Sequence, residues 1–294
     1  MRFLIFLSVI VLIGCQDPAN KEQESGDSLT KLDAQKEGGS DIIMVDGALF
    51  SIPSPVEAAL FIKDNGSGFR EDILLNPNST DLYPTSAQKA MALGAYGAEL
   101  GYVSMYEQND RSLSYMGAAR KLADDIGMTG AFSEDLVRRF SNNVGIPDSL
   151  VVLVSDIYKA GDLYLKNNDR NDIAALVLLG GWVESFYITC TEAEKGNIAF
   201  HKRIAEQKEG LMRLKAMLDM YPENVAIREL KPQMDNLIND FNNVKANYVF
   251  KRPEVINAKQ LTVLKGGSVH EMDETTFKNI IAHTKELRKA ITRN

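Results

Sequence analysis

Two glutamates lie on apolar faces of predicted helices, where a carboxylate is costly. Glu99 has apolar or aromatic residues three and four positions away on both sides, and small or apolar residues flank Glu184 at the same spacings. Residues at these spacings share a helix face, so we expect both carboxyl groups to point inward or into a cleft. A buried carboxyl group needs a partner or a raised pKa, and a pair of them can perform acid–base chemistry or hold a metal.

A structural role is the competing interpretation for both glutamates. In that case a tyrosine hydroxyl or Arg120 satisfies each carboxyl group inside the core. His201 is the best candidate for a third member of an acid–base site, and nothing in the sequence brings it to the glutamates.

A strip of tyrosines accompanies the first glutamate. Tyr96, Tyr102 and Tyr106 lie with Glu99 along one predicted helix. Aromatic faces stack on ligands while phenol hydroxyls form hydrogen bonds, so this strip, with Glu184, is a candidate groove for a sugar or a peptide. The alternative is that the strip is ordinary core. Gly94, Gly97 and Gly101 on the same helix indicate a neighbouring backbone at close range, because a helical glycine otherwise only destabilises.

The composition and motifs give little evidence for nucleic-acid binding, a cofactor, a metal site or a known catalytic site. The 294 residues are 45% hydrophobic and 25% charged, with 33 Lys and Arg against 40 Asp and Glu, and only three His and two Cys are present. This is ordinary globular composition, and the acidic balance argues against nucleic acid as a partner. No nucleophile elbow, zinc-protease motif, Cys-x-x-Cys, Walker loop or dinucleotide glycine pattern occurs. We therefore predict no cofactor and no metal. Enzymatic activity is uncertain, and a non-enzyme is favoured.

Helical periodicity positions these residues and dominates the chain beyond residue 41. Caps, prolines and glycine stops predict helices over 55–66, 85–108, 110–126, 133–144, 148–167 and from 169 or 171 through an apolar stretch to at least 182. Two antiparallel helices with heptad-like stripes follow, over 204–221 and 230–248, and a last helix covers 273–291.

The pattern predicts an all-α fold, an irregular multi-helix bundle. A helical-hairpin array of the tetratricopeptide type is the second choice, because 108–111 and 167–170 are similar junctions between helices. A small β-hairpin is expected before the C-terminal helix, with strands at 261–264 and 268–270 and a turn at Lys265-Gly266-Gly267.

The amino-terminal residues predict export and attachment to a membrane. One positive charge precedes an apolar run that is too short to span a bilayer comfortably, so residues 1–14 are interpreted as a signal peptide. The run ends in Leu12-Ile13-Gly14-Cys15, which resembles the bacterial lipobox. That resemblance implies cleavage before Cys15 and acylation of its sulfur by fatty acids such as palmitate, which would anchor the mature protein to a membrane.

Residues 15–41 are predicted to be a flexible tether, and residues 42–294 to be a helical domain. As a flexible coil the tether would hold the body about 30 Å from the membrane. Gln16 stands where an aspartate retains enterobacterial lipoproteins in the inner membrane, so we expect outer-membrane localisation, on the periplasmic or the surface face. Ser28, in Asp27-Ser28-Leu29, matches the acceptor pattern of Bacteroidota O-glycosylation. Cys190 is expected to be a buried, unreactive thiol.

Three further stretches carry a family resemblance. Residues 52–57, 93–102 and 123–127 are similar to those of an uncharacterised family of Bacteroidota helical lipoproteins. The resemblance implies lipoprotein sorting and an all-helical body, and it carries no activity and no site residues.

Three hypotheses follow for the function. The first is a non-enzymatic, membrane-anchored envelope protein that binds a partner protein or envelope component through a helical surface. The second is a binding module for a small ligand, a sugar or a peptide, in the groove around Tyr96, Glu99 and Tyr102. The third is an envelope hydrolase that uses Glu99 or Glu184, whose carboxyl groups would then converge in a solvent-reachable cleft.

Overall fold

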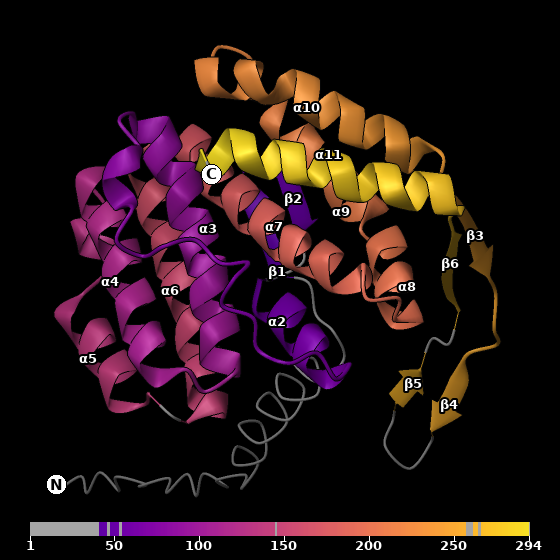
Figure 1. Ribbon diagram of the computed structural model, residues 1–294, viewed down its shortest axis with the longest axis horizontal. Helices are drawn as coiled ribbons and strands as arrows, with labels where there is room; N and C mark the ends of the chain where they lie inside the picture. The colour runs from indigo at the N-terminus through magenta and orange to yellow at the C-terminus, as the bar shows by residue number, and fades with distance from the viewer. Residues whose placement is uncertain are drawn as a thin grey trace, which may run out of the picture. The chain divides into compact units, whose positions relative to one another are not determined.

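The protein is an all-α bundle with a few short strands (Figure 1). The computed structural model describes residues 41–293 apart from 46, 47, 53, 54, 145, 257–260, 264 and 265. The predicted signal peptide, Cys15 and Ser28 lie outside the described residues. The helices in chain order are α2 (Pro55–Asp64), α3 (Ser86–Met105), α4 (Asn109–Asp125), α5 (Glu134–Asn142), α6 (Pro147–Asn167), α7 (Asn171–Ala193), α8 (Ile198–Glu206), α9 (Lys208–Leu218), α10 (Val225–Asn242) and α11 (Glu274–Thr292).

Helices α3 and α7 form the centre of the bundle, and both are buried along most of their length. The two helices cross at glycines, whose lack of a side chain lets the backbones approach closely. A Cβ atom on Gly94 would lie 2.0 Å from the carbonyl oxygen of Val177, and one on Gly180 would lie 1.9 Å from that of Met91. The close approach expected at Gly94 is therefore present. By length and composition α7 could cross a membrane, but 78% of its most apolar stretch is buried inside the protein.

Local capping signals explain where the helices begin and end. Thr85 accepts a hydrogen bond from the backbone N–H of Gln88 and forms a capping box at the start of α3. Gly127, with a φ of 78°, follows the end of α4, as its sequence predicts. Ser133 caps α5 and Asp273 caps α11 through their side chains.

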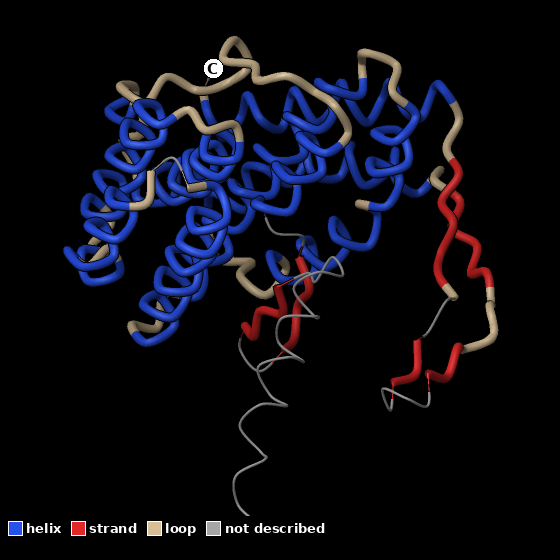
Figure 2. Tube along the Cα trace, turned by 90° about the horizontal axis from the view of Figure 1, so that it is seen from below, coloured by secondary structure: helices blue, strands red, loops and turns tan. Residues whose placement is uncertain are grey.

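The strands pair differently from the prediction. β3 (Lys245–Val249) pairs antiparallel with β6 (Gly267–Glu271), and β4 (Glu254–Ile256) pairs with β5 (Leu261–Val263). An antiparallel hairpin does precede the C-terminal helix, but β5 and β6 are not partners, so the predicted turn at 265–267 is wrong. Figure 2 shows these two strand pairs extending away from the helices. A further hairpin, β1 (Asp41–Val45) with β2 (Ala48–Ile52), was not expected.

The heptad-like helices also differ in their bounds. The first stripe is divided between α8 and α9 at Gln207, although Leu211, Leu214 and Leu218 are buried as expected. The second helix, α10, ends at Asn242 and does not continue to Tyr248, which lies in β3. Short 3₁₀ turns, η1 (Thr80–Leu82) and η2 (Thr129–Ala131), precede α3 and α5.

Candidate functional site

The two predicted glutamates meet in the core and share one arginine. Glu99 on α3 and Glu184 on α7 are both completely buried, and Arg288 on α11 is 9% exposed. The Arg288 Nε and Nη2 atoms donate to the two oxygens of Glu184, each at 2.9 Å in the closer pairs. The distance from Arg288 Nη2 to Glu99 Oε1 is 3.9 Å. Geometry of this kind, two parallel bonds from guanidinium to carboxylate, is the strong form of the ion pair.

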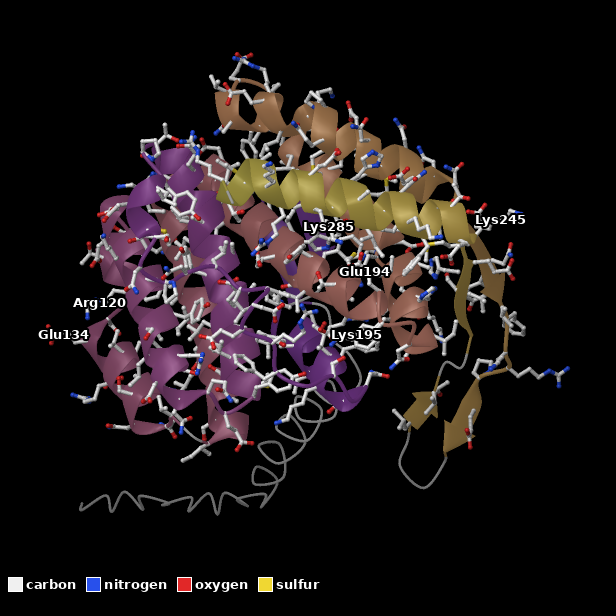
Figure 3. All side chains as sticks on the ribbon, in the orientation of Figure 1. Arg120, Glu134, Glu194, Lys195, Lys245 and Lys285 are labelled. Carbon is white, nitrogen blue, oxygen red and sulfur yellow. The ribbon has the colours of Figure 1, made fainter. Side chains whose placement is uncertain are left out.

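Arg288 is the partner that sequence reasoning missed. Arg120 was the expected cation, but it lies on the outer face of α4 and its nearest carboxylate is Asp124, 3.9 Å away (Figure 3). A signal for Arg288 was present, since it follows Thr284 by four residues and precedes Ile291 by three on the buried stripe of α11. Its guanidinium carbon also lies 4.0 Å from the centre of the Tyr187 ring, which gives the cation an aromatic neighbour.

The surroundings of Glu99 favour its protonated form. Its Oε1 accepts a hydrogen bond from the backbone N–H of Leu75 at 2.6 Å, and its Oε2 has no other hydrogen-bond donor within reach. Burial raises the pKa of Glu99 well above its usual range, and the neighbouring charge of Glu184 raises it further. A hydrogen bond between the two carboxyl groups also raises the pKa of Glu99, because it requires a proton on one of them. The cluster then contains one negative and one positive charge and is neutral.

The tyrosine strip binds a peptide segment that belongs to the chain itself. Residues 67–76 lie along the strip, and the hydroxyls bond to their backbone. Tyr96 donates to the carbonyl of Asn76 at 2.8 Å, and Tyr106 donates to that of Ser67 at 2.6 Å. The hydroxyl of Tyr102 accepts the backbone N–H of Arg70 at 3.0 Å.

Two further side chains hold the same segment. Tyr115 on α4 donates to the carbonyl of Leu75 at 2.6 Å, and Arg288 donates to that of Ile73 at 3.1 Å. Helices α3, α4 and α11 thus fix a stretch that forms no regular structure of its own. Its backbone polar groups would be costly if they were buried without such partners.

Within the described part of the chain, the tyrosine strip is covered by the 67–76 segment and does not line the open groove that we expected. Tyr96 and Tyr102 are at most 1% exposed, and Tyr106 is only partly buried. Burial raises the pKa of Tyr102 to about 12 and raises the pKa values of Tyr96 and Tyr106 further, so all three phenols are neutral at physiological pH. The tyrosine hydroxyls form hydrogen bonds with the chain's own backbone that a ligand would otherwise form. The strip and the 67–76 segment are therefore part of the core, as the competing interpretation predicted.

The remaining candidate residues do not join this cluster. His201 stacks on Phe277, with ring centres 3.8 Å apart. Cys190 is completely buried, as expected, and burial raises the pKa of its thiol. Among the residues that the structure describes, no three His, Cys, Asp or Glu side chains lie close enough together to hold a metal ion.

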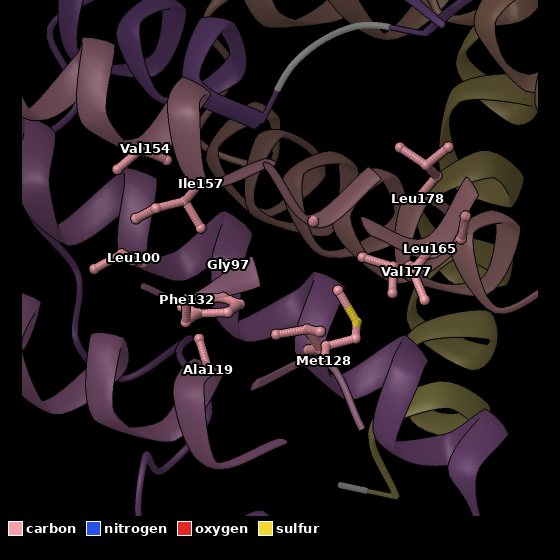
Figure 4. A pocket seen from close by; sticks show the side chains of 13 residues that line it. Gly97, Leu100, Ala119, Met128, Phe132, Val154, Ile157, Leu165, Val177 and Leu178 are labelled. Carbon is pink, nitrogen blue, oxygen red and sulfur yellow. The ribbon is translucent and has the colours of Figure 1, made fainter. Parts of the chain in front are cut away.

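An apolar cavity of about 50 Å³ lies apart from the cluster, between α3, α4, α6 and α7. Figure 4 shows side chains that line it, among them Leu100, Met128, Phe132 and Ile157. It is large enough for a few water molecules but is almost wholly apolar, and cavities of that kind remain dry.

Chemically, the buried cluster can stabilise but cannot reach a substrate in this conformation. Glu99 and Glu184 converge in the core and not in a cleft, where Arg288 donates to both oxygens of Glu184 and the Leu75 N–H donates to one oxygen of Glu99. Comparisons with protein-family models, with curated proteins and with solved structures gave no match.

Proposed function

We propose that the chain is a lipid-anchored protein of the bacterial cell envelope, attached to the membrane at Cys15. The observation that carries the proposal is the string Leu12-Ile13-Gly14-Cys15 at the end of a short apolar run that follows a single positive charge. Two or three acyl chains hold a protein far more firmly than one, because each buried methylene contributes about 0.8 kcal/mol. Gln16 favours the outer membrane as the destination.

The helical body is proposed to bind a partner protein or another envelope component without catalysing a reaction. The burial of Glu99 and Glu184 supports this view, since an envelope hydrolase would need both carboxyl groups in contact with solvent and substrate. The small-ligand alternative loses its support for a related reason. The hydroxyls of Tyr96, Tyr102 and Tyr106 already bond to the 67–76 segment.

Acylation is tested by feeding cells an alkyne analogue of palmitate. The two cysteines provide a matched pair of variants, because Cys15→Ser removes the proposed acceptor while Cys190→Ser changes a buried thiol. We expect the wild-type chain and Cys190→Ser to carry the label and Cys15→Ser to lack it. Mass spectrometry of the mature protein should find Cys15 as its first residue. A wild-type chain that is unlabelled and still begins at Met1 would overturn the anchor.

The outer-membrane destination is tested with a substitution at Gln16. Density separation of inner and outer membranes should place the wild-type chain in the outer fraction, while Gln16→Asp should shift it to the inner fraction in an enterobacterial host. Equal distribution of the two proteins would contradict the role assigned to Gln16.

Partner binding is tested by cross-linking in intact cells, followed by purification of the acylated chain from solubilised envelope. A protein or polymer that is enriched reproducibly over a bait of equal abundance, another lipoprotein, supports the proposal. An abundant, folded bait that enriches nothing would refute it.

A further inference from the structure

A two-stranded ribbon projects from the helical body, and most of its described residues are exposed, although His270 of β6 contacts Glu209 of α9. We use the name β-ribbon for the β3–β6 and β4–β5 pairs with the described residues beside them, 245–256, 261–263 and 266–271. Every residue of β3 is exposed, and β6 is exposed except at His270. An isolated two-stranded hairpin is only marginally stable in water, so a second surface against the ribbon would stabilise it.

The exposed side chains of the β-ribbon include large apolar ones. Tyr248 is 68% exposed and Phe250 is 70% exposed, and Val249, Leu261 and Val269 are each more than 40% exposed. Tyr248 and Val249 are neighbours in a strand, so they point to opposite faces. The apolar surface therefore surrounds the ribbon, whereas a site for a protein partner would concentrate it on one face.

The charge of the β-ribbon opposes that of the rest of the chain. The sequence stretch 245–271 contains five Lys and Arg and two Glu, whereas residues 15–244 and 272–294 together contain 27 Lys and Arg and 38 Asp and Glu. Lys251 and Arg252 directly follow Phe250, and all three are exposed. Figure 3 shows Lys245 at the base of the ribbon, where β3 begins. Exposed aromatic rings and basic side chains together are the combination that binds the interface of a membrane with anionic lipids.

We propose that the β-ribbon inserts into the headgroup region of a lipid leaflet that contains anionic lipid. Rings such as Tyr248 and Phe250 would lie at the level of the headgroups, and Lys251 and Arg252 would contact lipid phosphates. This contact, together with the acyl anchor, would set the orientation of the helical body.

The inference rests on the proposed function in one respect, the anchor at Cys15. An acyl anchor on the same chain raises the effective concentration of the ribbon at the membrane, so weak intrinsic binding is sufficient. Binding to lipid does not itself require the anchor, and it can be measured without it.

The experiment uses the chain from Gln16 onward, which lacks Cys15. Residues 40–294 form one compact unit, and every described core residue lies between Val56 and Ile291, so this chain keeps the core. We expect it to sediment with vesicles of equal parts phosphatidylglycerol and phosphatidylcholine at low salt, and to remain in solution with pure phosphatidylcholine. Added salt should release it.

Two sets of variants have matched controls on distant helices. Lys251→Gln with Arg252→Gln should weaken binding about 25-fold, because each basic residue near an anionic surface contributes about fivefold. The control, Lys121→Gln with Arg138→Gln, removes one exposed Lys and one exposed Arg from α4 and α5.

The second set removes an exposed apolar side chain. Phe250→Ser should weaken binding about tenfold, whereas Leu163→Ser, a residue of α6 that is 60% exposed, should leave it unchanged. Circular dichroism should show the same helical content for every variant.

The proposal fails if the wild-type chain does not sediment with anionic vesicles, if it binds neutral vesicles equally well, or if the ribbon variants bind as tightly as their controls. Because this chain cannot be acylated, none of these results depends on the anchor. Loss of the palmitate label would in turn overturn the anchor and leave the lipid-binding result unchanged.

Discussion

The two buried glutamates should respond to the same substitution with very different losses of stability. In Glu184→Gln the Arg288 guanidinium loses the carboxylate that accepts its paired hydrogen bonds at 2.9 Å, and the cation stays buried without that partner. Removing one partner of a buried ion pair costs about 3–5 kcal/mol. For a domain of this size each kcal/mol lowers Tm by about 2–4 °C, so Glu184→Gln should lower it by about 6–20 °C.

Glu99→Gln should cost about 1 kcal/mol or less. Glutamine resembles the protonated acid, because its carbonyl oxygen can accept the Leu75 N–H and its amide can donate to Glu184 as the carboxyl hydroxyl does. Thermal and urea unfolding of the chain from Gln16 onward at neutral pH measures both variants. Equal losses of stability, or a greater loss for Glu99→Gln, would refute the assignment of the proton to Glu99.

The pH dependence of unfolding provides a second measurement on the same pair. The folded-state pKa of Glu99 is raised, first by burial and then by Glu184, so folding favours its protonated form. Its contribution to stability is fully present below the usual carboxyl pKa of 4.5 and is lost as pH rises through the folded-state value. The free energy of unfolding of the wild-type chain should therefore decrease relative to that of Glu99→Gln over this interval. A constant difference between the two proteins would contradict the raised pKa.

Two other substitution pairs test the helix crossing and the predicted acceptor at Ser28. Gly180→Ala should destabilise the protein by about 3 kcal/mol or more in urea unfolding, since its Cβ would lie 1.9 Å from the Met91 carbonyl oxygen. Gly117→Ala, with no atom within 4 Å of the new Cβ, should stabilise by up to about 1 kcal/mol, and equal effects would refute the packing argument. In a Bacteroidota host Ser28→Ala should remove a glycan mass that Ser149→Ala, in helix α6, retains; an unmodified wild-type chain would contradict the acceptor assignment.

Features that depend on neighbouring residues could be predicted from the sequence. The capping residue Thr85 and the stop at Gly127 act within one helical turn, so α3 and α4 begin and end within a few residues of the prediction. The inward direction of Glu99 and Glu184 followed from the same periodicity.

Pairings between distant segments could not be predicted in this way. Arg288 lies 104 residues from Glu184, and no helical spacing connects them. Two adjacent glycines at 266 and 267 are typical of a hairpin turn. The partner of β6 is nevertheless β3, and the β4–β5 pair lies between these two strands in the sequence. The packing of the 67–76 segment on the tyrosine strip could not be predicted either, because this segment has no periodic pattern. The β1–β2 hairpin did have a signal, Asp46-Gly47 between two apolar runs.

The bond from Arg288 to the carbonyl of Ile73 joins residues 215 positions apart. Loop closure over such a distance is slow, so the buried cluster should be among the last parts of the protein to form. Until α11 packs against the bundle, Glu184 lacks its ion pair with Arg288, and the 67–76 segment lacks the hydrogen bond from Arg288 to the Ile73 carbonyl. For the exported protein proposed above, this late step would keep the chain from folding completely before it has crossed the membrane.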